Sequence, residues 1–91
     1  MSTFSCVESV LESKIDDEIV LMSLDNGYYF ALDEIGSSIW ELLQVRPSSL
    51  VELCQELVKE YDITEVQCQS ETHIFLQDLV EQGLIKETIL D

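Results

Sequence analysis

Residues 25–43 constrain the fold most, because they join a turn, a strand and a helix with no linker between them. Asn26-Gly27 is the favoured pair for a two-residue hairpin loop, since both positions accept the positive φ of a type I′ turn. The run Tyr28–Leu32 fits a pleated, half-buried strand. Asp33 can then accept a backbone hydrogen bond at the start of a helix. The segment predicts a hairpin whose second strand leads directly into a helix.

Two more strands are predicted before this hairpin loop. Val7–Lys14 is the weaker candidate and Ile19–Leu24 the stronger one, with the turn-forming pair Asp16-Asp17 between them. Two turns that join three strands in sequence order predict a three-stranded antiparallel meander.

After Asp33 the apolar spacing changes from two residues to about 3.6, which is typical of helices. The first helix is predicted over about Glu34–Gln44, and it ends before Pro47, which disfavours helix at the preceding residue. The second helix is predicted to begin at Ser49, because Glu52 three residues later completes a capping box.

A third helix is predicted to start after Thr64, with Gln67 as capping-box partner, and to end at Gly83. Leu84-Ile85 should pack back as a short extension. Three strands followed by three helices predict an α+β domain, with the helices on one face of a three-stranded antiparallel sheet. The second and third helices resemble a helix-turn-helix, and one domain is expected over residues 1–91.

The charge balance excludes two classes of partner. The chain has 19 acidic and 4 basic residues, for a formal net charge of −15. Phosphate backbones are bound through clusters of Lys and Arg, so nucleic-acid binding is excluded. An anionic membrane surface is excluded for the same reason.

Location and thiol chemistry are also constrained. No apolar run reaches the roughly 18 to 20 residues of a membrane span, and the N-terminus lacks a secretion-signal pattern, so we expect a cytoplasmic protein. Cys6, Cys54 and Cys68 are an odd number at wide spacing, which fits neither a disulfide framework nor a zinc site. Cys54 and Cys68 fall on apolar helix faces, where core packing is the expected role.

No catalytic constellation is evident in the sequence. The single histidine, His73, falls on the predicted third helix away from its apolar stripe, which is typical of a solvated side chain. The carboxylates are scattered over helix faces and do not form a dyad in an apolar setting. The sequence therefore predicts a binding protein without enzymatic activity, cofactor or metal.

The third helix offers one wall of a possible groove. Ile74 projects about 120° from the apolar stripe centred on Cys68, at about 100° per residue, and lies among polar residues. A single exposed isoleucine is also common in proteins that bind nothing there. The functional interpretation is that the groove is bordered by Gln67, Glu71, Ile74, Phe75 and Asp78.

The predicted third strand offers the other wall. In a meander this strand has one free edge, where an extended peptide can add and gain main-chain hydrogen bonds. Leu32 is expected to face the core, on the same side as Tyr28 and Phe30, whereas Tyr29 and Ala31 face the other way. Sheet packing is the simpler role for Phe30. The candidate binding residues on this strand are Tyr28, Tyr29, Phe30, Ala31 and Leu32.

The ordered residues resemble a known family. The first part of the pattern is Asn26-Gly27-x-Tyr29-x-x-Leu32-Asp33-x-x-Gly36-x-x-Ile39-Trp40-x-Leu42-Leu43. Its continuation is Glu60-Tyr61-Asp62-Ile63 and then Phe75-Leu76-x-x-Leu79-x-x-x-Gly83-Leu84-Ile85. This set resembles the PqqD-like family, the leader-binding elements of pathways that make and modify ribosomal peptides.

The resemblance implies a winged helix-turn-helix that binds a leader peptide as an added strand between its third strand and third helix. The chain looks most like the discrete recognition subunit of lasso-peptide biosynthesis. That likeness implies a separate cysteine peptidase that removes the leader and a cyclase that uses ATP. It also implies a pocket near Ile74 and Phe75 for a Tyr or Pro of the leader. A PqqD-like chaperone of another peptide pathway and an acidic protein-binding module remain as alternatives.

Overall fold

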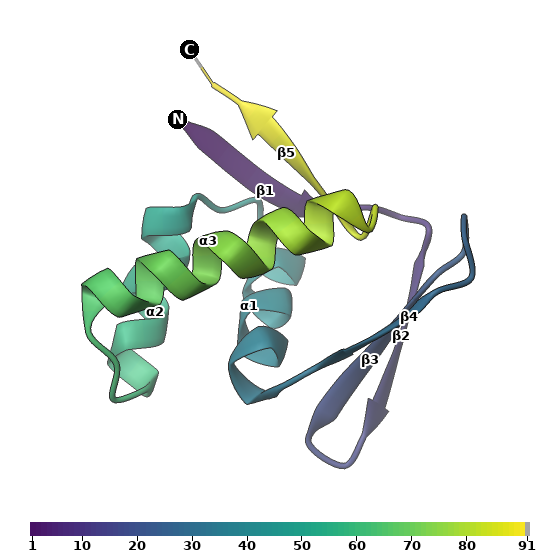
Figure 1. Ribbon diagram of the computed structural model, residues 1–91, viewed down its shortest axis with the longest axis horizontal. Helices are drawn as coiled ribbons and strands as arrows, with labels where there is room; N and C mark the ends of the chain where they lie inside the picture. The colour runs from purple at the N-terminus through teal and green to yellow at the C-terminus, as the bar shows by residue number, and fades with distance from the viewer. Residues whose placement is uncertain (91) are drawn as a thin grey trace.

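Three helices and two small antiparallel sheets make up the computed structural model, which describes residues 1–90 (Figure 1). The predicted α+β class, with a three-stranded antiparallel sheet followed by three helices, is confirmed. The elements in chain order are β1 (Ser2–Cys6), β2 (Val10–Ile15), β3 (Glu18–Ser23), β4 (Tyr29–Leu32), α1 (Glu34–Val45), α2 (Leu50–Glu60), α3 (Glu65–Glu81) and β5 (Ile85–Ile89).

The three-stranded sheet has the order β2-β3-β4. Its first hairpin turns at Asp16-Asp17 as predicted, with Asp16 at a φ of 58°. The second hairpin differs from the prediction of a two-residue Asn26-Gly27 turn, because its loop is four residues long, from Leu24 to Gly27. The Ser23 N–H donates to the Tyr28 carbonyl over 3.0 Å and closes this longer loop.

Local hydrogen bonds favour the longer loop. The Asn26 side chain accepts from the Tyr28 N–H at 3.0 Å, and the Asp25 carboxylate accepts from the Ser9 hydroxyl at 3.0 Å. Gly27 has a φ of 75° and donates its N–H to the Ser23 carbonyl over 2.8 Å. Asn26 therefore serves as a side-chain acceptor and not as a second residue with positive φ.

The second sheet was not predicted. β1 pairs antiparallel with β5, from Ser2 opposite Ile89 to Cys6 opposite Ile85, and this brings the two ends of the chain together. The expected short extension at Leu84-Ile85 is in fact the start of β5. Partners more than 75 residues apart in sequence give no local signal, since each strand alone is short and mostly polar outside Phe4 and Ile85.

The helix starts follow the predicted caps. Asp33 Oδ1 accepts from the Gly36 N–H at 2.7 Å at the start of α1. At α2 both halves of the capping box form, with Ser49 Oγ accepting from the Glu52 N–H and Glu52 Oε1 accepting from the Ser49 N–H. Each such bond satisfies an orphan donor of the first turn.

At α3 the cap is simpler than predicted. Thr64 Oγ1 accepts from the Gln67 N–H at 3.2 Å, but the Gln67 side chain donates to Glu71 Oε1 instead of closing a capping box. The helix ends as predicted, with Gly83 at a φ of 76° and the Leu84 N–H donating to the Leu79 carbonyl.

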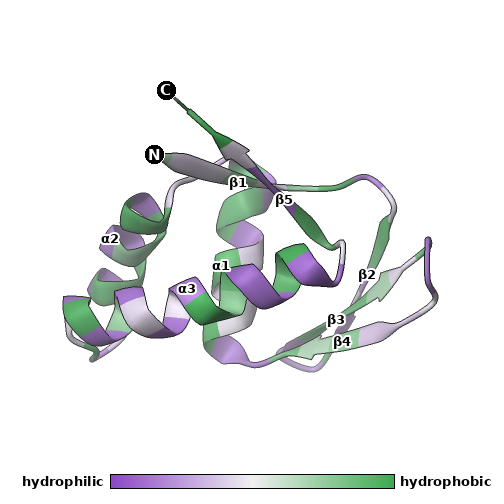
Figure 2. Cartoon of the chain, turned by 45° about the horizontal axis from the view of Figure 1, so that its top comes forward, coloured by the Kyte–Doolittle hydropathy of each residue, from purple (hydrophilic) through white to green (hydrophobic). Residues whose placement is uncertain are grey.

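The core lies where the helices meet each other and the inner face of β3 and β4. Leu79 is fully buried, and Cys54 and Cys68 are buried, as predicted. α1 packs on β3 and β4, and α2 packs on α3. Figure 2 shows green and purple segments alternating along α3, as expected for a helix with one buried face. Within residues 1–90, no helix combines the length and apolarity that a bilayer span needs.

Candidate peptide-binding site

β4 is an edge strand. It pairs with β3 on one side, and within residues 1–90 no strand pairs with its other edge. The Ser23 N–H donates to the Tyr28 carbonyl, so the backbone carbonyl of Tyr28 points toward β3. Because backbone groups alternate in direction along an antiparallel strand, those of Phe30 and Leu32 point to β3. The N–H and C=O groups of Tyr29 and Ala31 therefore point to the open edge.

The β4 side chains divide between two faces, as the alternation predicts. Leu32 is buried, and Phe30 is half-buried against the core. Tyr29 is 72% exposed, and Ala31 is exposed on the same side. Tyr28 was expected on the core side with Leu32, but it precedes β4 beside the hairpin loop and is 68% exposed. The main chain of β4 is thus available to a peptide, whatever side chains the strand carries.

The exposed side of α3 carries a shallow hollow of about 660 Å³. Four of the five predicted groove residues on this helix line it: Glu71, Ile74, Phe75 and Asp78. Ile74 is 67% exposed there. The fifth, Gln67, lies in the first turn of α3 and contacts the site through its bond to Glu71. His73 is exposed on the same helix, as predicted for a solvated histidine.

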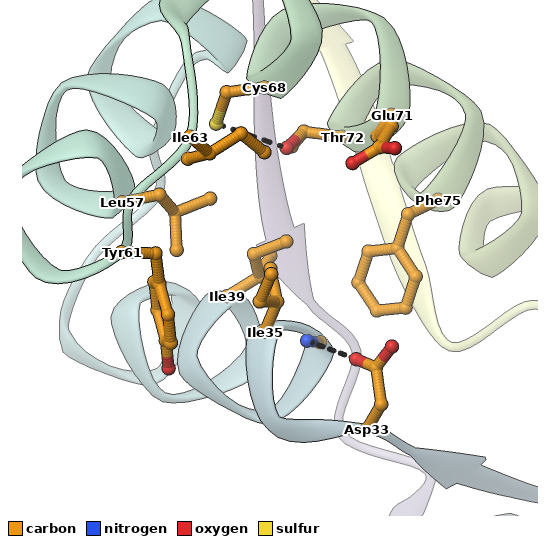
Figure 3. A pocket seen from close by; sticks show the side chains of 11 residues that line it. Asp33, Ile35, Ile39, Leu57, Tyr61, Ile63, Cys68, Glu71, Thr72 and Phe75 are labelled. Atoms are coloured by element: carbon orange, nitrogen blue, oxygen red, sulfur yellow. Dashed lines mark hydrogen bonds between the residues drawn. The ribbon is translucent and has the colours of Figure 1, made fainter.

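A deeper pocket of about 280 Å³ lies where α1, α2 and α3 meet, and Phe75 and Glu71 belong to both spaces (Figure 3). Its apolar lining comes from Ile35 and Ile39 of α1, Leu57 of α2, Cys68 and Phe75 of α3, and Tyr61 and Ile63 of the α2–α3 connection. Asp33, Gly36, Glu71 and Thr72 complete the lining.

Gly36 leaves room for the Phe75 ring. A Cβ at position 36 would lie 3.1 Å from the Phe75 ring, closer than an ordinary van der Waals contact. Figure 3 shows that ring pointing toward Asp33, across the opening between α1 and α3. The close approach of the ring to α1 explains why a glycine stands in the first turn of that helix.

Tyr61 is held against α1. Its hydroxyl lies 2.7 Å from the Ser38 hydroxyl and donates to the Glu34 carbonyl at 3.5 Å. On the other wall the Cys68 thiol and the Thr72 hydroxyl are 3.7 Å apart. These bonds fix the polar atoms along the walls, so the space between them is lined mainly by aliphatic and aromatic groups.

Sequence reasoning did not name Ile35, Tyr61 and Ile63 as site residues. Two of them stood in the family pattern Glu60-Tyr61-Asp62-Ile63, which was a usable signal. Their position relative to Phe75 depends on how α2 packs on α3, and helical spacing within one element does not give that packing.

The charge around both spaces has one sign. Asp33 and Glu71 lie at the pocket, and Asp78 and Glu81 lie in the hollow. No Lys or Arg lines either space among the described residues. A ligand therefore meets an apolar interior with an anionic rim.

The buried Cys54 thiol and the half-buried Cys6 thiol are poor candidates for reactive groups. Burial, reinforced by the neighbouring Cys68, raises the pKa of the Cys54 thiol to about 11. Burial also raises the pKa of the Cys6 thiol to about 11. A thiol that stays protonated at neutral pH is a weak nucleophile and a weak metal ligand. Over residues 1–90, no group of three His, Cys, Asp or Glu side chains is arranged to hold a metal ion.

The family model described as "Coenzyme PQQ synthesis protein D (PqqD)" matches residues 18–85 of this chain. One similar solved structure is "TbiB1 in Complex with the TbiA(beta) Leader Peptide", at a TM-score of 0.84 and 31% identity, covering 96% of this chain and 99% of that one. Another is "Lasso peptide synthetase B1 complexed with the leader peptide", at a TM-score of 0.77 and 21% identity, covering 91% and 96%. At 21% identity the second likeness concerns the fold alone. Among curated proteins no sequence matches.

Proposed function

Because the chain belongs to the PqqD family, we propose that it binds the leader segment of a ribosomal precursor peptide and delivers that peptide to a separate leader peptidase in lasso-peptide maturation. The observation that most supports this proposal is the 31% identity over 96% of the chain to TbiB1, which was solved with a leader peptide. Residues 1–91 then act as a single leader-recognition domain.

The leader binds as an added strand between β4 and α3. The outward backbone groups of Tyr29 and Ala31 offer two donors and two acceptors to an extended peptide. Each bond contributes about 1 kcal/mol net, so the main chain alone gives modest affinity. Side chains of the leader that face α3 supply the remainder.

Two cavities beside α3 can receive those leader side chains. One side chain reaches the shallow hollow beside Ile74, and another enters the pocket past Phe75. The family pattern implies a Tyr or Pro in the leader. Such a side chain suits a mainly apolar pocket in which the Tyr61, Cys68 and Thr72 side chains already have hydrogen-bond partners.

The domain contributes binding and no catalysis of its own. A subunit that holds the leader and also contacts the peptidase raises the effective concentration of substrate without adding a catalytic group. The cleavage belongs to a separate cysteine peptidase and the ring closure to an ATP-dependent cyclase. The free thiols Cys6, Cys54 and Cys68 are typical of a reducing compartment, and we place the complex in the cytoplasm.

A second candidate is a peptide chaperone of another modified-peptide pathway. The name of the matching family model, which refers to coenzyme PQQ synthesis, favours this reading. A gene neighbourhood with an asparagine-synthetase-like cyclase would select lasso biosynthesis over it. An acidic protein-binding module is the third alternative, and it predicts that no leader binds.

The test is a titration of the purified domain into a fluorescent leader peptide from its own gene neighbourhood. We expect saturable binding that is lost when the aromatic or proline anchors of the leader become alanine. A leader with scrambled sequence and the same composition is the control. Absence of binding by the folded domain would favour the acidic protein-binding module.

A further inference from the structure

The three-stranded sheet has a second face, turned away from α1, and six of the eight side chains on this face are apolar. Cross-strand register places Leu11, Met22 and Tyr29 in one row across β2, β3 and β4. Ser13, Val20 and Ala31 form the next row, and Ile15 continues the face along β2 opposite Glu18. These residues define the outer sheet face, and only Ser13 and Glu18 among them are polar.

The composition of the outer sheet face is unusual for a sheet surface that is exposed to solvent. An antiparallel sheet with one face on a core is normally polar on the other. Here Leu11 is 50% exposed, Ile15 61% and Tyr29 72%, and no helix of the described chain packs over them (Figure 1). The fold does not need these side chains for its core, since Ile19, Leu21 and Leu32 on the opposite face supply it. A contiguous exposed apolar area of this kind marks an interaction surface.

The side chains that border the outer sheet face include several carboxylates and no basic group among the described residues. Asp16, Asp17 and Glu18 lie at one end, in and beside the β2–β3 turn, and Glu8 and Asp25 lie near the other. All five are exposed. The nearest cation in sequence, Lys14, projects to the opposite face and pairs with Glu41 at 3.2 Å.

We propose that the outer sheet face is the docking surface for the leader peptidase, whose matching surface has an apolar centre and a rim of Lys and Arg side chains. This inference rests on the proposed function. Two copies of this chain docked through the same face would bring like charges together at the rim, which disfavours self-association. A partner with a basic rim gains from the same charges.

The outer sheet face adjoins the edge of β4 that receives the leader, and this position explains how the peptide is delivered to the peptidase. Tyr29 and Ala31 present their side chains on the outer sheet face, and their backbone groups point to the edge that receives the leader. A peptidase docked here lies beside the bound leader, at the same strand. Short-range transfer of the peptide follows from this adjacency.

The test separates this face from the leader site. Leu11→Thr/Met22→Thr changes β2 and β3 only, and threonine keeps the β propensity of both positions. The matched control is Val45→Thr/Val66→Thr, at apolar positions that are 80% and 82% exposed on helices. Each variant is labelled and titrated with the purified leader peptidase of the same pathway, and separately with the fluorescent leader.

We expect the strand variant to bind the peptidase about tenfold or more weakly, with unchanged leader affinity, and the helix control to match the wild type. Equal peptidase affinity for the strand variant, or no peptidase binding by a wild-type domain that binds the leader, would overturn the docking proposal alone. Failure of the wild type to bind the leader would instead overturn the proposed function and this inference with it.

A second variant tests the rim. Asp16→Asn/Asp17→Asn/Glu18→Gln removes three charges, and asparagine tolerates the positive φ at position 16. We expect weaker peptidase binding and a flatter dependence of affinity on salt than in the wild type. Unchanged salt dependence would contradict the basic rim. A dimer in sedimentation that Leu11→Thr/Met22→Thr dissociates would assign the face to a second copy and overturn the proposal.

Discussion

At the residue scale, two apolar side chains on α3 differ completely in solvent exposure although they are only five positions apart. Ile74 is 67% exposed in the hollow, and Leu79 is fully buried in the core. Burial decides how each responds to substitution, because a buried side chain supports the fold and an exposed one is free to contact a ligand.

Ile74→Asp should weaken leader binding with little change in the free energy of unfolding, because the side chain contributes to the hollow and not to the core. Leu79→Ala is the contrasting variant and should cost about 2–5 kcal/mol of stability through lost burial and a cavity. Anisotropy titration and urea unfolding of both variants provide the check. Full leader affinity in Ile74→Asp would remove Ile74 from the site.

Gly36→Ala should lower leader affinity by narrowing the pocket. The added Cβ would lie 3.1 Å from the Phe75 ring, so the ring must shift within the opening. Stability should change by no more than about 1 kcal/mol, since alanine is the better helix former by about that amount. The measurement is the same leader titration, and an unchanged dissociation constant would show that the position of Phe75 does not matter for binding.

At the element scale, local chemistry determined the parts that the sequence predicted well. Asp33, Ser49 and Thr64 each cap a helix because a side-chain oxygen reaches an N–H three residues on, which sequence spacing alone specifies. The pairing of β1 with β5 and the meeting of Tyr61 with α1 depend on distant segments, so sequence spacing did not reveal them. The edge position of β4 was predictable because two turns fix the order of a meander.

Glu52→Gln should lower stability near neutral pH, and the loss should shrink as the pH falls. Hydrogen bonds from Ser49, with Arg46 nearby, lower the pKa of Glu52 in the folded state. A lowered pKa means that the charged group stabilises the fold above its unfolded pKa, and that this contribution is lost as pH falls through the folded pKa. Thermal unfolding from pH 7 down to pH 3 tests this, with Glu56→Gln on the same helix as control. A difference from wild type that stays constant with pH would contradict the assignment.

Ala31→Pro should weaken leader binding about tenfold or more while the domain stays folded. The residue 31 N–H points to the open edge, so proline removes a donor for the leader and no bond within the sheet. Ala31→Val keeps the N–H and serves as the control. Normal leader affinity in Ala31→Pro would show that the peptide does not pair with this strand.

At the scale of the whole molecule, the strand β4 organises the functional surfaces. Its inner side chains join the core, its open edge is the proposed leader site, and its outer side chains join the proposed docking face. The β1–β5 pair holds both chain ends together at a distance from this strand (Figure 1). A net charge of −15 spread over such a small domain favours partners with basic surfaces and discourages contact between copies.

The most direct measurement is the rate of amide hydrogen exchange along β4. NMR monitors this rate for each residue, with and without saturating leader peptide. Tyr29 and Ala31 should exchange quickly in the free domain and about tenfold or more slowly when the leader is bound, because their N–H groups then donate to an added strand. Phe30 and Leu32, already bonded to β3, are the internal controls and should change little. Rapid exchange at Tyr29 and Ala31 in the saturated complex would contradict strand addition at this edge.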